Sequence, residues 1–207
     1  MLPELLMMVV LSLEPNPVAA ALARFEQLDA YQLTLRSQGD SGEEVIRYSY
    51  RRPGFIRMDL IMPYRGAVLI YSPETRRVQL WPFGSPGNRP SVSLSPLNRM
   101  VRSARGHRVD QSDVGTLLRN IQRLQEQGTL QQLGEVSLQG RRALQLVVEG
   151  APDQRVGEVA RYELWLDSET LFPLQVISRD DQGTRLEVVR FEDIDLDPEL
   201  PADHFSP

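Results

Sequence analysis

Apolar and polar residues alternate along residues 31–62 with the period of two that half-buried β-strands require. The apolar members of this pattern are Tyr31, Leu33, Leu35, Ile46, Tyr48, Tyr50, Ile56, Met58, Leu60 and Met62. Turn-forming residues at 39–42 and 53–54 interrupt the alternation, and further strands are expected at 67–71 and 77–83. Strands joined by such short turns run antiparallel, so the first part of the chain is predicted to be a five-strand meander.

The rest of the chain adds a second set of strands and a few helices. Strands are expected at 133–138, 143–149, 159–166, 173–179 and 184–194. A helix is expected at 17–28, because Asn16 and Pro17 form an N-cap and a first helical position. Residues 84–128 form a helical insert. Its first part is expected to be a loop rich in glycine, proline and serine, followed by a short helix at 96–104. Asp110 and Asp113 resemble a capping pair and indicate the start of a second helix.

About ten antiparallel strands with two or three helices predict the α+β class. A sheet of this width twists and curls into an incomplete barrel, and the helices cover its concave side. Residues 15–207 are expected to form this single half-barrel domain. Residues 1–14, which include an apolar run at 5–13, are expected to be a leader or a degraded export signal.

Composition excludes several kinds of chemistry. The chain has no cysteine, only two histidines, and 23 basic residues that are all arginine, so thiolate, multi-histidine and lysine chemistry are absent. No Gly-x-Ser-x-Gly motif is present, and neither His107 nor His204 belongs to a catalytic motif. We therefore expect no enzyme, no metal site and no cofactor. The net charge of −5 argues against a nucleic-acid partner.

A curved sheet beneath helices leaves an apolar space of the kind that holds an acyl chain. The residues expected to line this space are Leu33, Leu35, Ile46, Tyr48, Met58, Leu60, Val68, Ile70, Leu80, Leu144, Leu146, Leu164, Val176 and Val188. The residues expected in the helical lid are Leu22, Phe25, Leu117 and Ile121. The same apolar pattern also fits a packed core without ligand, and the sequence does not separate the two interpretations.

Four segments carry a resemblance to a known family. They are LARFEQLDAYQLTL (22–35), YRRPGFIRMDL (50–60), GAVLIYSPETRRVQLWPF (66–83) and YELWLDSETLFPLQVISRDDQGTRLEVVRFEDI (162–194). In this order the chain resembles the bacterial lipoprotein carrier superfamily, LolA/LolB-like, which includes the RseB-type lipid-binding domains. The resemblance extends over residues 16–207.

The resemblance implies a monomeric periplasmic or envelope-associated protein that binds lipid acyl chains or lipoproteins and sorts lipoproteins toward the outer membrane. A membrane or a partner protein would then accept the ligand. It also implies that an arginine before a proline holds the lid closed, which corresponds to Arg52, although Arg51 lies beside it. Two alternatives remain: an RseB-type signalling module that senses lipid and binds a regulator, and a structural envelope protein without ligand.

Two charged segments have both a functional and a plain interpretation. Arg99, Arg102, Arg105 and Arg108 could meet anionic lipid headgroups, but a solvated helix face is the preferred interpretation. The acidic residues at 192–199 lack the spacing of a calcium loop, so solvation of charge is the preferred interpretation.

Overall fold

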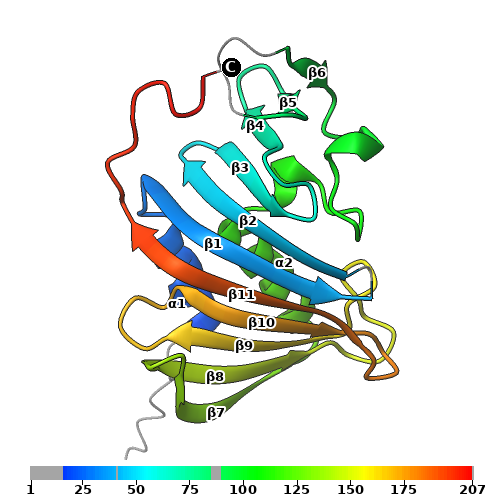
Figure 1. Cartoon of the computed structure of the whole chain (residues 1–207). Coiled ribbons are helices and arrows are strands. Elements are labelled where there is room, and N and C mark those ends of the chain that lie inside the picture. The colour runs from blue at the N-terminus through cyan, green and yellow to red at the C-terminus, as the bar shows by residue number, and fades with distance from the viewer. Residues whose placement is uncertain (1–15, 41, 85–89, 207) are drawn as a thin grey trace, which may run out of the picture.

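The computed structural model describes residues 16–40, 42–84 and 90–206, and it contains one sheet covered on one face by two α-helices (Figure 1). The helices are α1 (Pro17–Phe25) and α2 (Val114–Gln125), with the short 3-10 helices η1 (Arg99–Val101) and η2 (Val109–Gln111). The strands are β1 (Ala30–Gly39), β2 (Gly42–Arg51), β3 (Phe55–Met62), β4 (Val68–Ser72), β5 (Arg77–Trp81), β6 (Val92–Leu94), β7 (Thr129–Leu138), β8 (Arg141–Glu149), β9 (Arg161–Asp167), β10 (Pro173–Arg179) and β11 (Arg185–Leu196). The expected leader, residues 1–14, lies outside the described residues.

The strands follow the order β6-β5-β4-β3-β2-β1-β11-β10-β9-β8-β7, and each pairs antiparallel with its neighbours. The chain meanders outward from β1 to β6, passes through the insert, and returns from β7 to β11 beside β1. The sheet is not closed into a barrel, because β6 and β7 remain at its two edges. The predicted class, α+β with one curved antiparallel sheet under helices, is confirmed (Figure 1).

The helix expected at 17–28 ends at Phe25, and the strand expected at 133–138 begins at Thr129. Three predictions within the insert also differ from the structure. The segment expected to be a loop contains β6, a three-residue edge strand that pairs with β5 and is too short to leave a visible alternation. The short helix expected at 96–104 is reduced to η1. Helix α2 begins at Val114, not at Asp110, because the carboxylate of Asp113 is the N-cap that accepts from the Thr116 amide at 2.9 Å.

The two helices pack against each other as one layer, which we call the helical cover. Phe25 at the end of α1 lies against Gly115 in the first turn of α2. A Cβ added at Gly115 would lie only 2.3 Å from the Cε1 atom of Phe25, so only glycine permits this approach. This close approach of Phe25 to Gly115 is one of the contacts that hold the two helices together.

The core lies between the cover and the concave face of the sheet, and it includes residues from both. A second, smaller cluster lies on the opposite face, where Val68, Ile70, Trp81 and Phe205 pack together. The C-terminal segment that follows β11 carries Phe205 to this convex face. The guanidinium of Arg51 lies 4.7 Å from the centroid of the Phe205 ring and fixes the segment further.

Three residues predicted to line the concave space lie on the other face. Val68 and Ile70 pair with Asp59 and Arg57 and therefore share their convex face, where they join the smaller cluster. Val188 lies opposite Gln38, whereas its neighbour Val189 packs against the main core. The predictions failed because these stretches are apolar on both faces, so alternation did not identify the inner one.

Candidate functional site

Aromatic rings fill the centre of the concave side. Tyr31 lies between Tyr48 and Tyr50, with ring centroids 5.9 and 5.1 Å away, and Phe25 of the cover and Phe172 meet it edge-on. Tyr31 and Tyr48 are fully buried. These rings occupy the space where the sequence predicted room for an acyl chain.

The remaining cavity beneath the cover is small. A pocket of about 30 Å³ lies between α1, the start of α2 and the β9–β10 connection. It is lined by Ala21, Arg24, Phe25, Leu28, Val114, Leu118, Thr170, Leu171, Phe172, Pro173 and Leu196. This volume is about that of one water molecule, whereas sites for small molecules measure roughly 300–1,000 Å³. The structure is therefore a closed, packed state.

Most of the predicted lining residues do face the cover. Buried members of the main core are Leu33, Tyr48, Met58, Leu80, Leu146, Leu164 and Val176, and Leu35, Ile46, Leu60 and Leu144 pack against it. From the cover, Phe25 and Ile121 are buried in the same core, and Leu22 and Leu117 contact it. The set is contiguous, and its use as a ligand surface remains a prediction.

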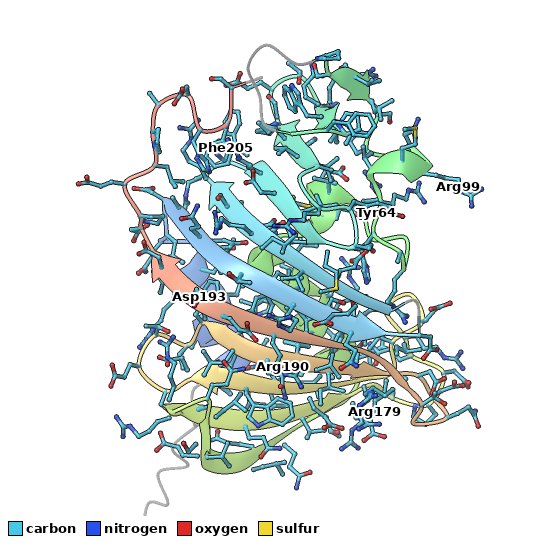
Figure 2. The ribbon with its side chains drawn as sticks, in the orientation of Figure 1. Tyr64, Arg99, Arg179, Arg190, Asp193 and Phe205 are labelled. Atoms are coloured by element: carbon cyan, nitrogen blue, oxygen red, sulfur yellow. The ribbon has the colours of Figure 1, made fainter. Side chains whose placement is uncertain are left out.

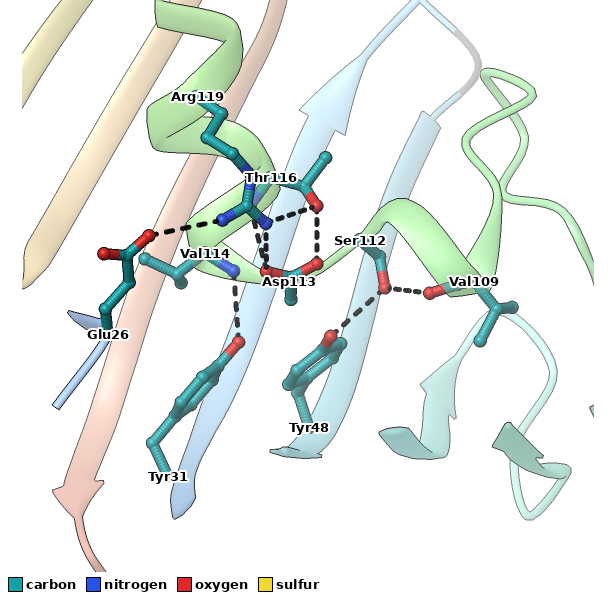
Figure 3. Close-up of polar contacts among 9 residues, drawn as sticks. All are labelled: Glu26, Tyr31, Tyr48, Val109, Ser112, Asp113, Val114, Thr116 and Arg119. Carbon is teal, nitrogen blue, oxygen red and sulfur yellow. Dashed lines mark hydrogen bonds and ion pairs between the residues drawn. The ribbon is translucent and has the colours of Figure 1, made fainter. Parts of the chain in front are cut away.

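Two tyrosine hydroxyls connect the sheet to the start of α2 (Figure 3). The Tyr31 hydroxyl accepts a hydrogen bond from the Val114 amide at 3.2 Å, and the Tyr48 hydroxyl lies 3.2 Å from Oγ of Ser112. Burial raises the pKa of both tyrosines, so their hydroxyls stay protonated at physiological pH. The cover is thus fastened at this point by neutral hydrogen bonds.

Arg119 of α2 joins the two helices. Its guanidinium lies 4.0 Å from the carboxylate of Glu26, just after α1, and 3.6 Å from that of Asp113 (Figure 3). These side chains except Asp113 are largely exposed, so the ion pairs contribute little to stability. Their effect is to hold the end of α1 beside the start of α2.

Arg52 reaches the segment that follows α1. Its Nε and Nη2 atoms donate to the carbonyl oxygen of Leu28 at 3.2 and 2.8 Å, and Nη2 also donates to that of Glu26. Arg51, in contrast, stacks on Phe55 and Phe205 on the convex face. The structure therefore assigns the contact with the lid carbonyls to Arg52. That this contact controls opening remains a prediction.

The last turn of α1 also contacts the β9–β10 connection. The guanidinium of Arg24 donates to the carbonyl oxygen of Glu169 in the β9–β10 connection. Arg24 and Thr170 also line the small pocket beneath the cover. Asp167 shapes the connection by accepting hydrogen bonds from the amides of Glu169 and Thr170.

A polar cluster fastens the insert to the other end of the concave face. Glu187 accepts from Oγ of Ser37 at 2.5 Å, and its second oxygen lies 3.1 Å from Nε2 of His107. This hydrogen bond raises the pKa of His107. Burial alone would raise the pKa of Glu187, but the bonds from His107 and Ser37 outweigh it and the net shift is downward. The pair therefore favours the charged forms of both residues.

Several residues of this site were not among the predicted site residues. Tyr31 and Tyr50 follow the alternation, but nothing in the sequence shows that their rings stack. Phe172 lies in the β9–β10 connection, which has no periodicity. From the sequence, Ser112 and Asp113 could be assigned only to the start of a helix, and their contacts could not be predicted. No group of three or more metal-ligating side chains occurs among the described residues.

The family model of the MucB/RseB N-terminal domain matches residues 91–207, which is more than half of the chain. The chain belongs to the MucB/RseB N-terminal domain family. This membership confirms the resemblance to the LolA/LolB-like superfamily and its RseB-type domains. No curated protein matches the sequence. Among the described residues, no helix combines the length and apolar character needed to cross a bilayer.

Solved structures share the fold of this MucB/RseB-family chain at low identity. An uncharacterized conserved protein from Thermus thermophilus has a TM-score of 0.58 and 15% identity, with coverage of 93% of this chain and 94% of that one. The lipoprotein LppX of Mycobacterium tuberculosis has a TM-score of 0.55 and 11% identity, with coverage of 90% and 96%. The MucA/MucB complex of Pseudomonas aeruginosa has a TM-score of 0.50 and 18% identity. The match covers 93% of this chain but only 61% of that one.

Proposed function

We propose that the chain is a periplasmic, non-catalytic protein that binds the acyl chains of a lipid or lipoprotein between its sheet and its helical cover. The observation that carries the proposal is the separate cover. Helices α1 and α2 lie over a continuous apolar interior, and the described polar contacts with the sheet are few, chiefly those of Tyr31, Tyr48 and Arg52. Family membership supports the same assignment.

Binding in this way requires the cover to move, because the pocket beneath it has a volume of only about 30 Å³. Burial of each CH₂ group of an acyl chain contributes about 0.8 kcal/mol. A chain of ordinary length therefore gains about 10 kcal/mol, enough to offset separation of the cover from part of its aromatic packing. Ligand and cover then compete for the same apolar surface.

The test is to extract the purified full chain with organic solvent, identify released lipid by mass spectrometry, and titrate the protein with the fluorescent fatty acid cis-parinaric acid. We expect bound lipid or saturable uptake of one fatty acid per chain. Glycerol 3-phosphate, which lacks an acyl chain, is the matched competitor and should displace nothing. An empty protein with no saturable uptake would contradict the proposal and favour the structural protein with a filled core.

A second candidate function, binding of a regulatory protein by an RseB-type module, has its own supporting observation. An open groove of about 680 Å³ lies beside the edge strand β7 and is lined by Asn16, Pro17, Gln125, Leu130, Gln132, Leu133 and Gly134. An edge strand offers unpaired backbone groups to which an extended peptide adds as a further strand. The similarity to MucB, solved together with MucA, fits this candidate.

A photo-crosslinking amino acid at position 133, in the groove, tests this candidate in the living source cell. Position 185, exposed in β11, is the control. A regulatory protein should crosslink at position 133 and not at 185. If no protein adduct forms at position 133, the candidate fails.

A further inference from the structure

Exposed apolar side chains concentrate in one part of the molecule. Seven of the nine large apolar side chains that are exposed in the described residues lie between positions 61 and 100, namely Ile61, Met62, Tyr64, Phe83, Val92, Leu97 and Met100. Tyr64, in the β3–β4 turn, and Met100, in η1, are each 69% exposed. The other two, Leu133 and Val136, belong to β7. Such a concentration within one part of the chain points to a candidate interaction surface there.

The same part of the molecule is strongly basic, although the whole chain carries a net charge of −5. Within the described residues of 61–109, Glu74 is the one acidic residue. The arginines in those residues are Arg65, Arg76, Arg77, Arg99, Arg102, Arg105 and Arg108. The acidic residues of the chain lie almost entirely elsewhere, so this lobe presents positive charge to solvent.

The structure separates the arginines that are available from those already paired. Arg105 lies 3.5 Å from the Glu158 carboxylate, and Arg108 pairs with Asp110 at 2.5 Å. Arg65 and Arg99 have no carboxylate partner among the described residues. Thus only part of the basic stretch recognised in the sequence can meet an external anion.

Available charge and exposed apolar groups lie together. Tyr64 and Arg99 lie toward the same side of the molecule in the view of Figure 2. Arg65 directly follows Tyr64, and Arg99 directly precedes Met100. Arg102, in the same segment, donates to the Leu97 carbonyl at 2.9 Å, which leaves its charge uncompensated. We name this group, residues 61–66 and 97–102, the basic apolar lobe.

We propose that the basic apolar lobe docks on the surface of an anionic phospholipid bilayer, with Tyr64, Leu97 and Met100 at headgroup depth and Arg65 and Arg99 on the phosphates. Apolar tips flanked by basic residues suit a bilayer, which is fluid and has no fixed shape to match. Neither the 680 Å³ groove nor the pocket beneath the cover includes a residue of the lobe, so the lobe is separate from both of those hollows. The proposal does not rest on the proposed function.

Vesicle co-sedimentation of the full chain tests the docking. Vesicles of phosphatidylcholine alone are compared with an equimolar mixture of phosphatidylcholine and phosphatidylglycerol, at low and high salt. We expect binding to the anionic vesicles that weakens with salt. The double variant Arg65→Gln/Arg99→Gln should lower the partition coefficient by about 25-fold, about fivefold for each arginine. The control Arg185→Gln removes an exposed arginine from β11 and should change it less than about twofold.

A reporter locates the contact itself. The chain already contains Trp81 and Trp165, so quenching is compared with that of the parent protein. In the variant Tyr64→Trp, brominated lipid in the anionic vesicles should quench a larger share of the tryptophan emission than in the parent, and Leu133→Trp, on β7, should show no such increase. Equal binding to both vesicle types, equal losses for the double variant and its control, or the absence of vesicle binding would each overturn the proposal. The last result would assign the lobe to a protein partner.

Discussion

Replacement of Arg52 by glutamine should loosen the helical cover without disturbing the sheet. The arginine side chain begins at the end of β2 and donates three hydrogen bonds to two backbone carbonyls beyond α1, those of Glu26 and Leu28. Glutamine is shorter and uncharged, so it does not reach both carbonyls. The carbonyls then turn to solvent, and the closed state loses one of its main connections to the cover.

The size of the effect follows from exposure and charge. Hydrogen bonds from charged groups contribute about 1.5–3 kcal/mol when shielded from water. The Arg52 side chain is 44% exposed, so solvent competes for its donors. A total of about 1–2 kcal/mol is therefore reasonable for the group of contacts, which corresponds to opening that is about 5 to 30 times more frequent.

Hydrogen exchange measured by mass spectrometry reports this opening directly. Amides of α1 should exchange about 5 to 30 times faster in Arg52→Gln, whereas those of β8 and β9 should be unchanged. Uptake of cis-parinaric acid should also be faster, because the closed state limits access to the interior.

Arg51→Gln is the matched control, since it removes the same charge one residue earlier and its side chain lies on Phe55 and Phe205. The argument would be refuted by unchanged exchange of α1 in Arg52→Gln. It would also be refuted if the control accelerated α1 to the same extent.

Three further perturbations have defined outcomes. Tyr31→Phe leaves the amide of Val114 without its acceptor and should lower the free energy of unfolding in urea by about 1–3 kcal/mol. Gly115→Ala forces a methyl group against the Phe25 ring and should lower it by about 1–3 kcal/mol, with faster exchange of α1. His107→Gln should lower the urea midpoint most between pH 4.5 and 6.5 and progressively less above, because the raised pKa of His107 stabilises the fold only while the imidazole is charged.

Each of these three predictions would be contradicted by a specific result. A Tyr31→Phe protein as stable as the parent would mean that the Val114 amide finds another acceptor. A Gly115→Ala protein with unchanged exchange of α1 would show that the two helices separate without cost. A pH-independent effect of His107→Gln would show that the bond to Glu187 does not depend on protonation.

The strand pattern of this fold is predictable because burial on one face imposes a period of two, as in Leu33 and Leu35 or Met58 and Leu60. The prediction fails where both faces are buried. Val68 and Ile70 lie under the C-terminal segment and Phe205, a contact between residues far apart in the sequence. Periodicity describes one strand at a time and therefore carries no information about what covers its second face.

The candidate site was predictable in outline only. The family resemblance pointed to Arg52, and its guanidinium donates to the carbonyl oxygens of Leu28 and Glu26, but its control of the cover stays a prediction. The aromatic filling was not predictable, because the stacking of Tyr31 on Tyr48 and Tyr50 depends on strand register. Whether an apolar interior is empty or packed depends on side-chain volumes in three dimensions, which a linear pattern does not contain.

Cross-linking the cover shut tests the central claim, that an acyl chain enters only when the cover separates from the sheet. The chain has no cysteine, so Arg24→Cys/Glu169→Cys introduces a unique pair where α1 meets the β9–β10 connection. After reaction with a short bismaleimide, the linked protein should take up no cis-parinaric acid, while the unlinked double variant and both single variants take it up normally. Equal uptake by the linked and unlinked proteins would contradict the account.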